Sequence, residues 1–343
     1  MPDERVDVLV VGSGLCGLAV AVTAARRGLT VRCVSDGRPG TSLTNFGQLH
    51  SGAVYAPVLP EVAQACWRHR SRWRDLARRA QVGGTHGLAL FDAADAVDRY
   101  RDAWHRIGID AVEVDPRAAG PFPTPAAAFR IPDHSVHLPT LHAGLAELAR
   151  AGGVPVAHRQ DVTLHRDPAS TLVSVGPWTP RAGMVVLATG ADTPGLLSGA
   201  GIRHTLRNRR IAWGRYAGPS PESLTYWLDG DLLAISPDRD GVRVGLPGVD
   251  GQYTASEPEL GRLRTALDRR GLRPLDRDLS LRWGSVCEPT SPHADPTSLA
   301  VDLRTPPPGW SPTANLVIAM PGKWTTAWHC ADHVTDHVTN SVP

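Results

Sequence analysis

The clearest pattern in the chain is an apolar run near its N-terminus that ends in closely spaced glycines. Residues 8–11 have the continuous hydrophobicity typical of a buried parallel strand, and Gly12, Gly14 and Gly17 follow in G-x-G-x-x-G spacing. The Ala-rich stretch 18–27 then favours a helix. A strand, a tight turn and a helix in this order predict a site for the pyrophosphate of a dinucleotide at the helix N-terminus.

A second strand is expected at 29–34, because Gly28 ends the first helix and another apolar run follows it. A dinucleotide site usually has an acidic residue at the end of this strand, where it binds the adenosine ribose. Ser35 and Asp36 stand there, so the acid is displaced by one position. Asp36 is therefore either the ribose ligand or an aspartate that only forms a turn.

The rest of the chain combines segments of an α/β pattern with segments of alternating apolar and polar residues. Helical spacing of apolar positions predicts helices at 66–79, 95–107, 140–151, 257–270 and 325–338. Continuous apolar runs predict further buried strands at 184–187 and 316–319. Alternating apolar and polar positions predict antiparallel strands at 210–216, 224–228, 232–236 and 242–246. The order of these segments indicates an α/β domain interrupted by a β-rich insertion.

Composition and charge limit the classes of function. A chain of 343 residues can bury a sizeable core, and a formal net charge of +2 gives no bias towards nucleic acid or a membrane surface. Five cysteines without C-x-x-C spacing argue against a disulfide framework or a structural zinc site. No run is apolar and long enough to cross a bilayer. We therefore expect a cytoplasmic protein that acts on a small molecule, in an oligomeric state that the sequence leaves open.

Three further motifs are spread along the chain. Residues 186–191 read V-L-A-T-G-A, residues 315–325 read N-L-V-I-A-M-P-G-K-W-T, and residues 45–55 read N-F-G-Q-L-H-S-G-A-V-Y. With the glycine turn, the first two resemble segments of the FAD-dependent amino-acid and amine oxidase superfamily, which includes D-amino-acid oxidase, glycine oxidase and sarcosine oxidase. The third is similar to the N-S-G-x-x-H-x-G-x-Y-Y segment of the L-2-hydroxyglutarate oxidase branch.

This resemblance implies an α/β fold with FAD as the cofactor. A Rossmann-like FAD-binding domain is assembled from discontinuous segments, expected at 1–80, 132–205 and 296–343. An antiparallel β-sheet substrate domain is expected at 81–131 and 206–295. The residues implied to bind FAD are Gly12, Gly14, Gly17, Ser35, Asp36, Asn45, Gly47, Ser51, Gly52, Gly190, Gly322, Lys323, Trp324 and Thr325.

Two side chains in these motifs are candidates for catalysis. His50 can take a proton from a substrate hydroxyl as hydride leaves the adjacent carbon, or it only hydrogen-bonds flavin or backbone. Lys323 is the only lysine in the chain and stands just before a predicted helix. Its ammonium group can stabilise negative charge on the reduced flavin or bind a substrate anion, or it simply faces solvent.

The segment 285–292 departs from the family pattern. Glu288 stands where the family's R-P-x-T-P-D segment has an arginine that often binds a substrate carboxylate, which argues against an ordinary amino-acid substrate. A cationic or polyhydroxyl substrate is one alternative. A second alternative is an anionic substrate bound from another side of the site, with Arg210, Arg215 and Arg282 as the candidate ligands. Cys287 lies one position away from the thioether attachment of FAD in sarcosine oxidases, so a covalent flavin is also considered.

Three histidines recur every four residues on the closing helix: His329, His333 and His337. Such spacing can form a metal-binding stripe, but the apolar stripe of the same helix lies on its other face. We therefore expect these histidines to be solvated and predict no metal site.

The leading interpretation is an FAD-dependent oxidoreductase. It removes hydride from a CH–OH or CH–NH carbon of a small polar substrate to flavin N5, and oxygen or another acceptor reoxidises the flavin. Two alternatives stay open. One is a flavin-binding protein with reduced catalysis, since fold alone does not determine function. The other is a nicotinamide-dependent oxidoreductase that uses the same glycine turn.

Overall fold

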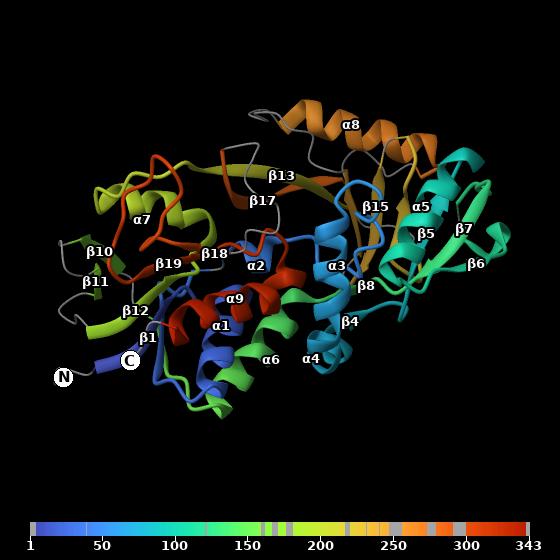
Figure 1. Cartoon of the computed structure of the whole chain (residues 1–343). Coiled ribbons are helices and arrows are strands. Elements are labelled where there is room, and N and C mark those ends of the chain that lie inside the picture. The colour runs from blue at the N-terminus through green and yellow to red at the C-terminus, as the bar shows by residue number, and fades with distance from the viewer. Residues whose placement is uncertain are drawn as a thin grey trace. The chain divides into compact units, whose positions relative to one another are not determined.

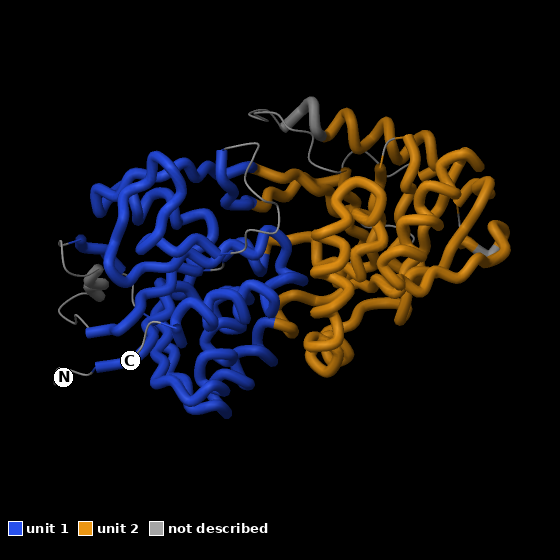
Figure 2. Tube along the Cα trace, viewed as in Figure 1, with its two compact units in different colours: residues 1–43, 142–209, 285–343 blue, residues 44–141, 210–284 orange. Residues whose placement is uncertain are grey.

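The structure is a computed structural model, shown in Figure 1 with its helices and strands labelled. It describes residues 5–38, 40–120, 122–158, 162–166, 171–175, 181–216, 220–230, 232–239, 241–246, 256–272, 279–290 and 300–340. The chain divides into two units, coloured separately in Figure 2. Unit 1 comprises Met1–Leu43, His142–Arg209 and Ser285–Pro343, and unit 2 comprises Thr44–Leu141 and Arg210–Gly284.

Unit 1 is built on a six-stranded sheet with the order β18-β19-β12-β1-β2-β9. The strands are β1 (Arg5–Val11), β2 (Val31–Ser35), β9 (Val156–His158), β12 (Arg181–Leu187), β18 (Ala300–Asp302) and β19 (Leu316–Ala319). Neighbouring strands are parallel from β19 to β9, and β18 runs antiparallel to β19. The predicted continuous apolar runs thus form the central strands, as expected for a parallel sheet buried on both faces.

Helices and short turns complete unit 1. They are α1 (Leu15–Arg26), α2 (Thr41–Thr44), most of α6 (Leu138–Ala151), α7 (Thr193–Gly199), α9 (Ala327–Thr339) and the 3₁₀ turns Gly190–Asp192 and Trp324–Thr326. A hairpin of β10 (Val162–Arg166) and β11 (Thr171–Val175) also belongs to it. The first and last helices, α1 and α9, lie side by side against the sheet (Figure 1).

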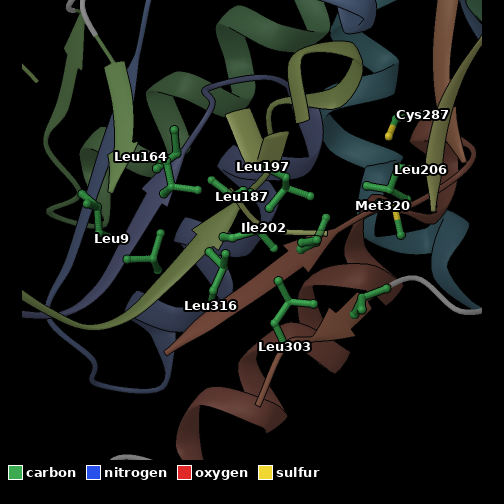
Figure 3. Close-up of a cluster of buried hydrophobic side chains, with 14 of the residues drawn as sticks. Leu9, Leu164, Leu187, Leu197, Ile202, Leu206, Cys287, Leu303, Leu316 and Met320 are labelled. Atoms are coloured by element: carbon green, nitrogen blue, oxygen red, sulfur yellow. The ribbon is translucent and has the colours of Figure 1, made fainter. Parts of the chain in front are cut away.

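The core of unit 1 joins residues from both ends and the middle of the chain (Figure 3). Leu9 of β1, Leu187 of β12 and Leu316 of β19 have no exposed surface and share one hydrophobic cluster with Leu303. Burying a leucine side chain contributes about 1.5–3 kcal/mol. The cluster thus takes buried side chains from all three segments of unit 1, so the burial of each segment depends on the other two.

Unit 2 is built on an eight-stranded sheet with the order β17-β13-β16-β15-β14-β5-β7-β6. Its strands are β5 (Gly87–Phe91), β6 (Val112–Val114), β7 (Ala127–Ile131), β13 (Leu206–Tyr216), β14 (Thr225–Trp227), β15 (Leu233–Asp238), β16 (Gly241–Gly245) and β17 (Ser280–Pro289). Of the two longest strands, 206–209 of β13 and 285–289 of β17 belong to unit 1. The pairs with a described register are antiparallel except β14 and β5, which are parallel. A smaller sheet joins β3 (Gln48–Leu49), β8 (His134–Val136) and β4 (Gln81–Val82) in the order β3-β8-β4.

One helix prediction in unit 2 needs correction. The segment 66–79 is not a single helix, because α3 (Pro60–His69) and α4 (Arg74–Ala80) are separated by the 3₁₀ turn Arg70–Trp73. The pattern of Trp67, Arg70 and Trp73 repeats every three residues, which is the period of a 3₁₀ helix rather than an α-helix. The remaining helical segments of unit 2 are α5 (Ala94–Ile107), α8 (Ser256–Arg269) and the 3₁₀ turn Pro116–Ala118.

The predicted α/β fold class is confirmed, with a Rossmann-like unit made of discontinuous segments and a largely antiparallel sheet in the other unit. The expected domain bounds remain a proposal. The units place 44–80 and 132–141 with the larger antiparallel sheet, because β3 pairs with β8 inside unit 2. In the described part of the chain, no helix combines the length and apolarity that a membrane crossing requires.

Candidate functional site

The carboxyl ends of four parallel strands lie level at one edge of the unit 1 sheet. Val11 at the end of β1 is in register with Val34 of β2 and Leu187 of β12, and Leu187 is in register with Ile318 of β19. Turns that leave these strands emerge at the same edge, where open parallel sheets bind ligands. The expected cofactor residues in these turns are Gly12, Gly14, Gly17, Ser35, Asp36, Gly190, Gly322, Lys323, Trp324 and Thr325.

The turn after β1 has no room for side chains. Gly12 has a φ of +107°, and a Cβ there would lie 2.5 Å from the carbonyl oxygen of Ala188. A Cβ on Gly17 would lie 1.9 Å from the carbonyl oxygen of Gly12. The first amides of α1 have no acceptor within the helix, and that of Leu15 donates to the Ser42 hydroxyl at 3.1 Å. Backbone donors at a helix N-terminus are what a pyrophosphate needs, so this turn fits the dinucleotide.

The end of β2 carries an ionised side chain. Asp36 accepts hydrogen bonds from the Arg38 amide, at 3.0 Å, and from the Arg38 guanidinium. Burial raises the pKa of Asp36, but the hydrogen bonds and charge of Arg38 outweigh it, so the pKa lies below its usual value. The Ser35 hydroxyl accepts from the Gly37 amide at 3.2 Å. Both side chains thus shape the turn, and their role towards a ribose stays a prediction.

The turn after β19 leads into the closing helix. Lys323 immediately precedes the 3₁₀ turn, and its carbonyl oxygen accepts from the Thr326 hydroxyl at 2.8 Å. The side chains of Trp324 and Thr325 are buried, whereas Gly322 is exposed. Lys323 itself is partly buried. The lysine is therefore held by an ordered turn rather than by a freely solvated loop.

His50 lies in unit 2, in a buried hydrogen-bond network. The pairing of Leu49 with His134 between β3 and β8 brings the next residue, His50, beside Asp133. His50 Nδ1 is 3.2 Å from Asp133 Oδ2, and Nε2 is 3.1 Å from the Tyr55 hydroxyl. Asp133 is fully buried and His50 is 6% exposed. Both ring nitrogens of His50 are thus engaged within the unit.

Asp133 accepts four hydrogen bonds. The Ser51 amide at 2.6 Å and the Ser51 hydroxyl bind Oδ1, while His50 and the Tyr226 hydroxyl, at 3.0 Å, bind Oδ2. Burial raises the pKa of Asp133, but its bonds to His50 and Ser51 and the charge interaction with His50 lower it below the usual value. An ionised carboxylate only accepts hydrogen bonds, so His50 Nδ1 is the donor to Asp133, and in the neutral ring Nε2 is then the acceptor for the Tyr55 hydroxyl.

The sequence pointed to His50 but not to Asp133 or Tyr226. Neither residue belongs to a motif, and Asp133 is distant from His50 along the chain. Their contact with His50 follows from the pairing of two very short strands, β3 and β8, which local periodicity does not reveal. Strand register, not spacing, therefore assembles this network.

The remaining expected cofactor residues of unit 2 lie in the loop before His50 and just after it. The Asn45 side chain accepts from the Gly47 amide at 3.5 Å, and buried Arg243 donates to the carbonyl oxygen of the residue between them at 2.7 Å. Gly52 packs against the backbone of Ala63 in α3. The loop is thus held in one conformation by unit 2 itself.

Cys287 does not have the environment of a flavin attachment site. It is buried in the core of unit 1 with Met320 (Figure 3), and burial raises the pKa of its thiol to about 12. Covalent attachment needs a thiolate, which this environment disfavours. Residues 291 and 292 of the expected segment lie outside the described residues.

Glu288 does not face a cation-binding surface. Its carboxylate lies 3.0 Å from the guanidinium of Arg207 and 3.1 Å from that of Arg209. The charge is therefore balanced within unit 1, which removes the argument for a cationic substrate. Of the expected anion ligands, Arg215 lies 3.6 Å from a carboxylate and Arg210 lies over an indole ring at 4.6 Å.

The expectation that all three histidines of α9 are solvated needs correction. The His329 and His333 rings contact each other with centroids 4.5 Å apart, and His337 Nδ1 lies 3.5 Å from Asp302 Oδ2. His333 is exposed and the other two are partly buried. Within the described residues, no group of three or more His, Cys, Asp or Glu side chains is arranged to hold a metal ion.

Comparison with known proteins places this geometry in a family. A family model described as FAD dependent oxidoreductase (DAO) matches residues 7–337. A search of curated proteins found no match. Glycine oxidase from Geobacillus kaustophilus has a similar structure, with a TM-score of 0.72, 17% identity, and coverage of 99% of this chain and 96% of the other.

Two further structures show the same fold. Iminodiacetate oxidase from Chelativorans sp. BNC1 has a TM-score of 0.72 at 18% identity, covering 98% of this chain and 96% of the other. L-α-glycerophosphate oxidase from Mycoplasma pneumoniae, solved with FAD bound, has a TM-score of 0.71 at 17% identity, covering 98% and 95%. The family match confirms FAD as the cofactor and argues against the nicotinamide alternative. The chain belongs to the FAD-dependent oxidoreductase (DAO) family.

Proposed function

We propose that this enzyme removes hydride from a CH–OH or CH–NH carbon of a small polar substrate and passes the electrons to oxygen or another acceptor. The observation that carries the proposal is the buried Asp133–His50 pair, because oxidation of such a carbon also releases a proton. FAD, when bound, supplies the hydride acceptor at its N5 position. The chain itself must hold the cofactor and accept the proton.

His50 is the proposed proton acceptor. In the arrangement described above its neutral ring presents a lone pair at Nε2, while Nδ1 donates to Asp133. When the ring gains a proton, the buried carboxylate stabilises the imidazolium, as in other base–carboxylate pairs. Ser51 supports the same carboxylate with both its amide and its hydroxyl. We therefore assign Ser51 a positioning role besides the cofactor contact that its motif implies.

Unit 1 is proposed to hold the dinucleotide part of FAD. The amides of the turn 12–17 face the pyrophosphate, Asp36 or Ser35 binds the ribose, and Gly190 leaves the backbone room beside it. Gly322, Lys323, Trp324 and Thr325 form the ordered turn proposed to contact the flavin ring. In unit 2, the residues proposed to contact the ring are Asn45, Gly47 and Gly52, on the strength of their match to the family segment.

The names of structurally similar enzymes cover both donor classes. Glycine and iminodiacetate are amines, whereas glycerophosphate is an alcohol. The alternative of a flavin-binding protein with reduced catalysis remains the second candidate. A reducing, cytoplasmic compartment is part of the proposal, supported by five cysteines that form no disulfide in the described part of the chain: Cys16, Cys33, Cys66, Cys287 and Cys330.

The first prediction concerns the substrate. Anaerobic mixing of the FAD-loaded protein with hydroxy acids, amino acids, amines and sugars should bleach the flavin absorbance with at least one CH–OH or CH–NH donor. Product analysis then separates the two classes, since ammonia or a free amine signals C–N oxidation and a simple ketone signals C–OH oxidation. Photoreduction serves as the control for a reducible flavin. A flavin that is photoreduced but bleached by no donor would favour the reduced-catalysis alternative.

The second prediction concerns Lys323. Lys323→Met should lower the flavin reduction potential or weaken binding of an anionic substrate about tenfold or more, since a hydrogen bond to a charged group contributes about 1.5–3 kcal/mol. Lys323→Arg keeps the charge and should change either quantity much less. Potentiometry and substrate titration measure the two effects. If both quantities are unchanged in the methionine variant, neither role holds.

The third prediction concerns the glycine turn. Gly17→Ala should lower both the amount of FAD retained per chain and the melting temperature, because its Cβ overlaps a backbone carbonyl that cannot move alone. Gly195→Ala in α7 is the matched control, since a Cβ there meets nothing within 4 Å. Absorbance after desalting and thermal unfolding measure the two quantities. Equal FAD retention by both variants would argue against the assigned pyrophosphate turn.

A further inference from the structure

The buried network of unit 2 continues one residue beyond the Asp133–His50 pair, to Tyr55. We infer that Tyr55 is the catalytic residue that receives the substrate proton and relays its own proton to His50, and that the substrate is therefore a CH–OH donor. The inference rests on the proposed oxidation and deepens it. His50 then accepts the proton that Tyr55 relays, and Asp133 is a positioning residue that holds the His50 ring.

The exposed fractions of the three side chains indicate from which end a proton enters the network. Asp133 is fully buried, His50 is 6% exposed, and Tyr55 is the partly exposed member of the three. The exposed part of the network thus belongs to Tyr55, and we place the entry of the substrate proton on that side. The 3.1 Å distance from the Tyr55 hydroxyl to Nε2 allows direct transfer between them.

A second tyrosine, Tyr226, contacts the Asp133–His50 pair but cannot relay a proton to His50 Nε2. The Tyr226 hydroxyl lies 3.0 Å from Asp133 Oδ2 and 3.4 Å from His50 Nδ1, and its side chain is 2% exposed. Its hydrogen bond ends on the carboxylate, so it leads to no basic lone pair. Tyr226 stabilises Asp133, whereas Tyr55 donates to the nitrogen that can accept a proton.

The transfer balances in atoms and electrons. The substrate O–H bond breaks and its proton joins the Tyr55 oxygen, while the Tyr55 O–H bond breaks and that proton joins His50 Nε2. The electron pair of the substrate O–H bond becomes the second bond of the C=O group. The adjacent C–H bond breaks, and its hydrogen leaves with the electron pair as hydride, for which FAD, when bound, would be the acceptor. The substrate loses two electrons and two hydrogens, and the chain holds the extra proton as imidazolium.

A hydroxyl donor needs this relay more than an amine does. An alcohol keeps its proton at neutral pH, so removal of that proton must accompany loss of the hydride. An amine can enter in its neutral form with a lone pair already present, and it then needs no base. A base that is held in place by a fully buried, hydrogen-bonded carboxylate is therefore better explained by an alcohol substrate.

The neighbourhood of the relay keeps Tyr55 protonated before reaction. Burial raises the pKa of Tyr55, and the nearby charges of Cys66 and Asp133 raise it further. Tyr55 therefore passes a proton on rather than acting as a free tyrosinate. The titratable and charged groups around the relay are Cys66 on α3, Arg70, Asp133, His134 on β8 and Tyr226 on β14.

The direct test uses the unmodified holoenzyme. Flavin reduction by a CH–OH donor from the substrate panel is followed anaerobically in mixtures of H₂O and D₂O. A relay moves two protons, so the rate should fall along a curved line as the deuterium fraction rises. A straight line would mean that a single proton moves, which would overturn the relay.

Matched variants give a second test. Tyr55→Phe should slow flavin reduction by a CH–OH donor about 10²-fold or more, the usual contribution of a proton-transfer residue. Tyr216→Phe is the matched control, because it removes a buried hydroxyl that makes no hydrogen bond in the described part of the chain, and it should change the rate less than about threefold. Equal rates for wild type and Tyr55→Phe would overturn the inference while the proposed function stands. A panel in which no donor bleaches the flavin would overturn both.

The solvent isotope effect separates positioning from mere structural support. Asp133→Asn removes the charge that stabilises the imidazolium, so proton transfer should limit the rate more strongly and the isotope effect on flavin reduction should increase. A rate that falls in Asp133→Asn with an unchanged isotope effect would show that Asp133 only supports the fold.

Discussion

The parallel pairing of β1 with β12 is the constraint on which the cofactor unit depends. It joins the N-terminal segment to the middle of the chain, and β19 joins the C-terminal segment to the same sheet. Because the strands are in register at their carboxyl ends, turns from distant parts of the sequence emerge at one edge. The proposed cofactor site is thus a property of strand register, and the glycines after β1 allow α1 to begin there without steric conflict.

Unit 2 has a different physical problem, which is a carboxylate with no exposure to water. A buried charge is costly unless hydrogen bonds and an opposite charge compensate it. Asp133 has four donors around its two oxygens, one of them an imidazole that can become positive. A proton gained by the neutral His50 ring places a positive charge beside this carboxylate. A site with that property can receive a proton from a reaction and release it later.

Much of the architecture was predictable because short stretches of sequence determine it. The continuous apolar runs at 8–11, 184–187 and 316–319 became the central strands of unit 1, and the glycine spacing identified the turn after β1. The Asp133–His50 contact was not predictable, since it follows from the pairing of β3 with β8, two strands too short to show a period. Burial of Cys287 and pairing of Glu288 also depend on tertiary neighbours that sequence does not display.

The break in the helix predicted at 66–79 shows the same limit at smaller scale. A repeat of three and a repeat of between three and four residues differ little over two turns, so the 3₁₀ turn Arg70–Trp73 was hidden in a helical pattern. Local sequence therefore predicts which segments are regular, and tertiary packing decides where one regular form gives way to another.

The central claim is that turns from both ends of the chain meet at one sheet edge to hold a single FAD. Calorimetric titration of the flavin-free, folded chain with FAD tests it most directly. The account predicts saturable binding of one FAD per chain with the visible absorbance of a bound flavin. A chain that keeps its folded circular dichroism spectrum but takes up no FAD would contradict the account.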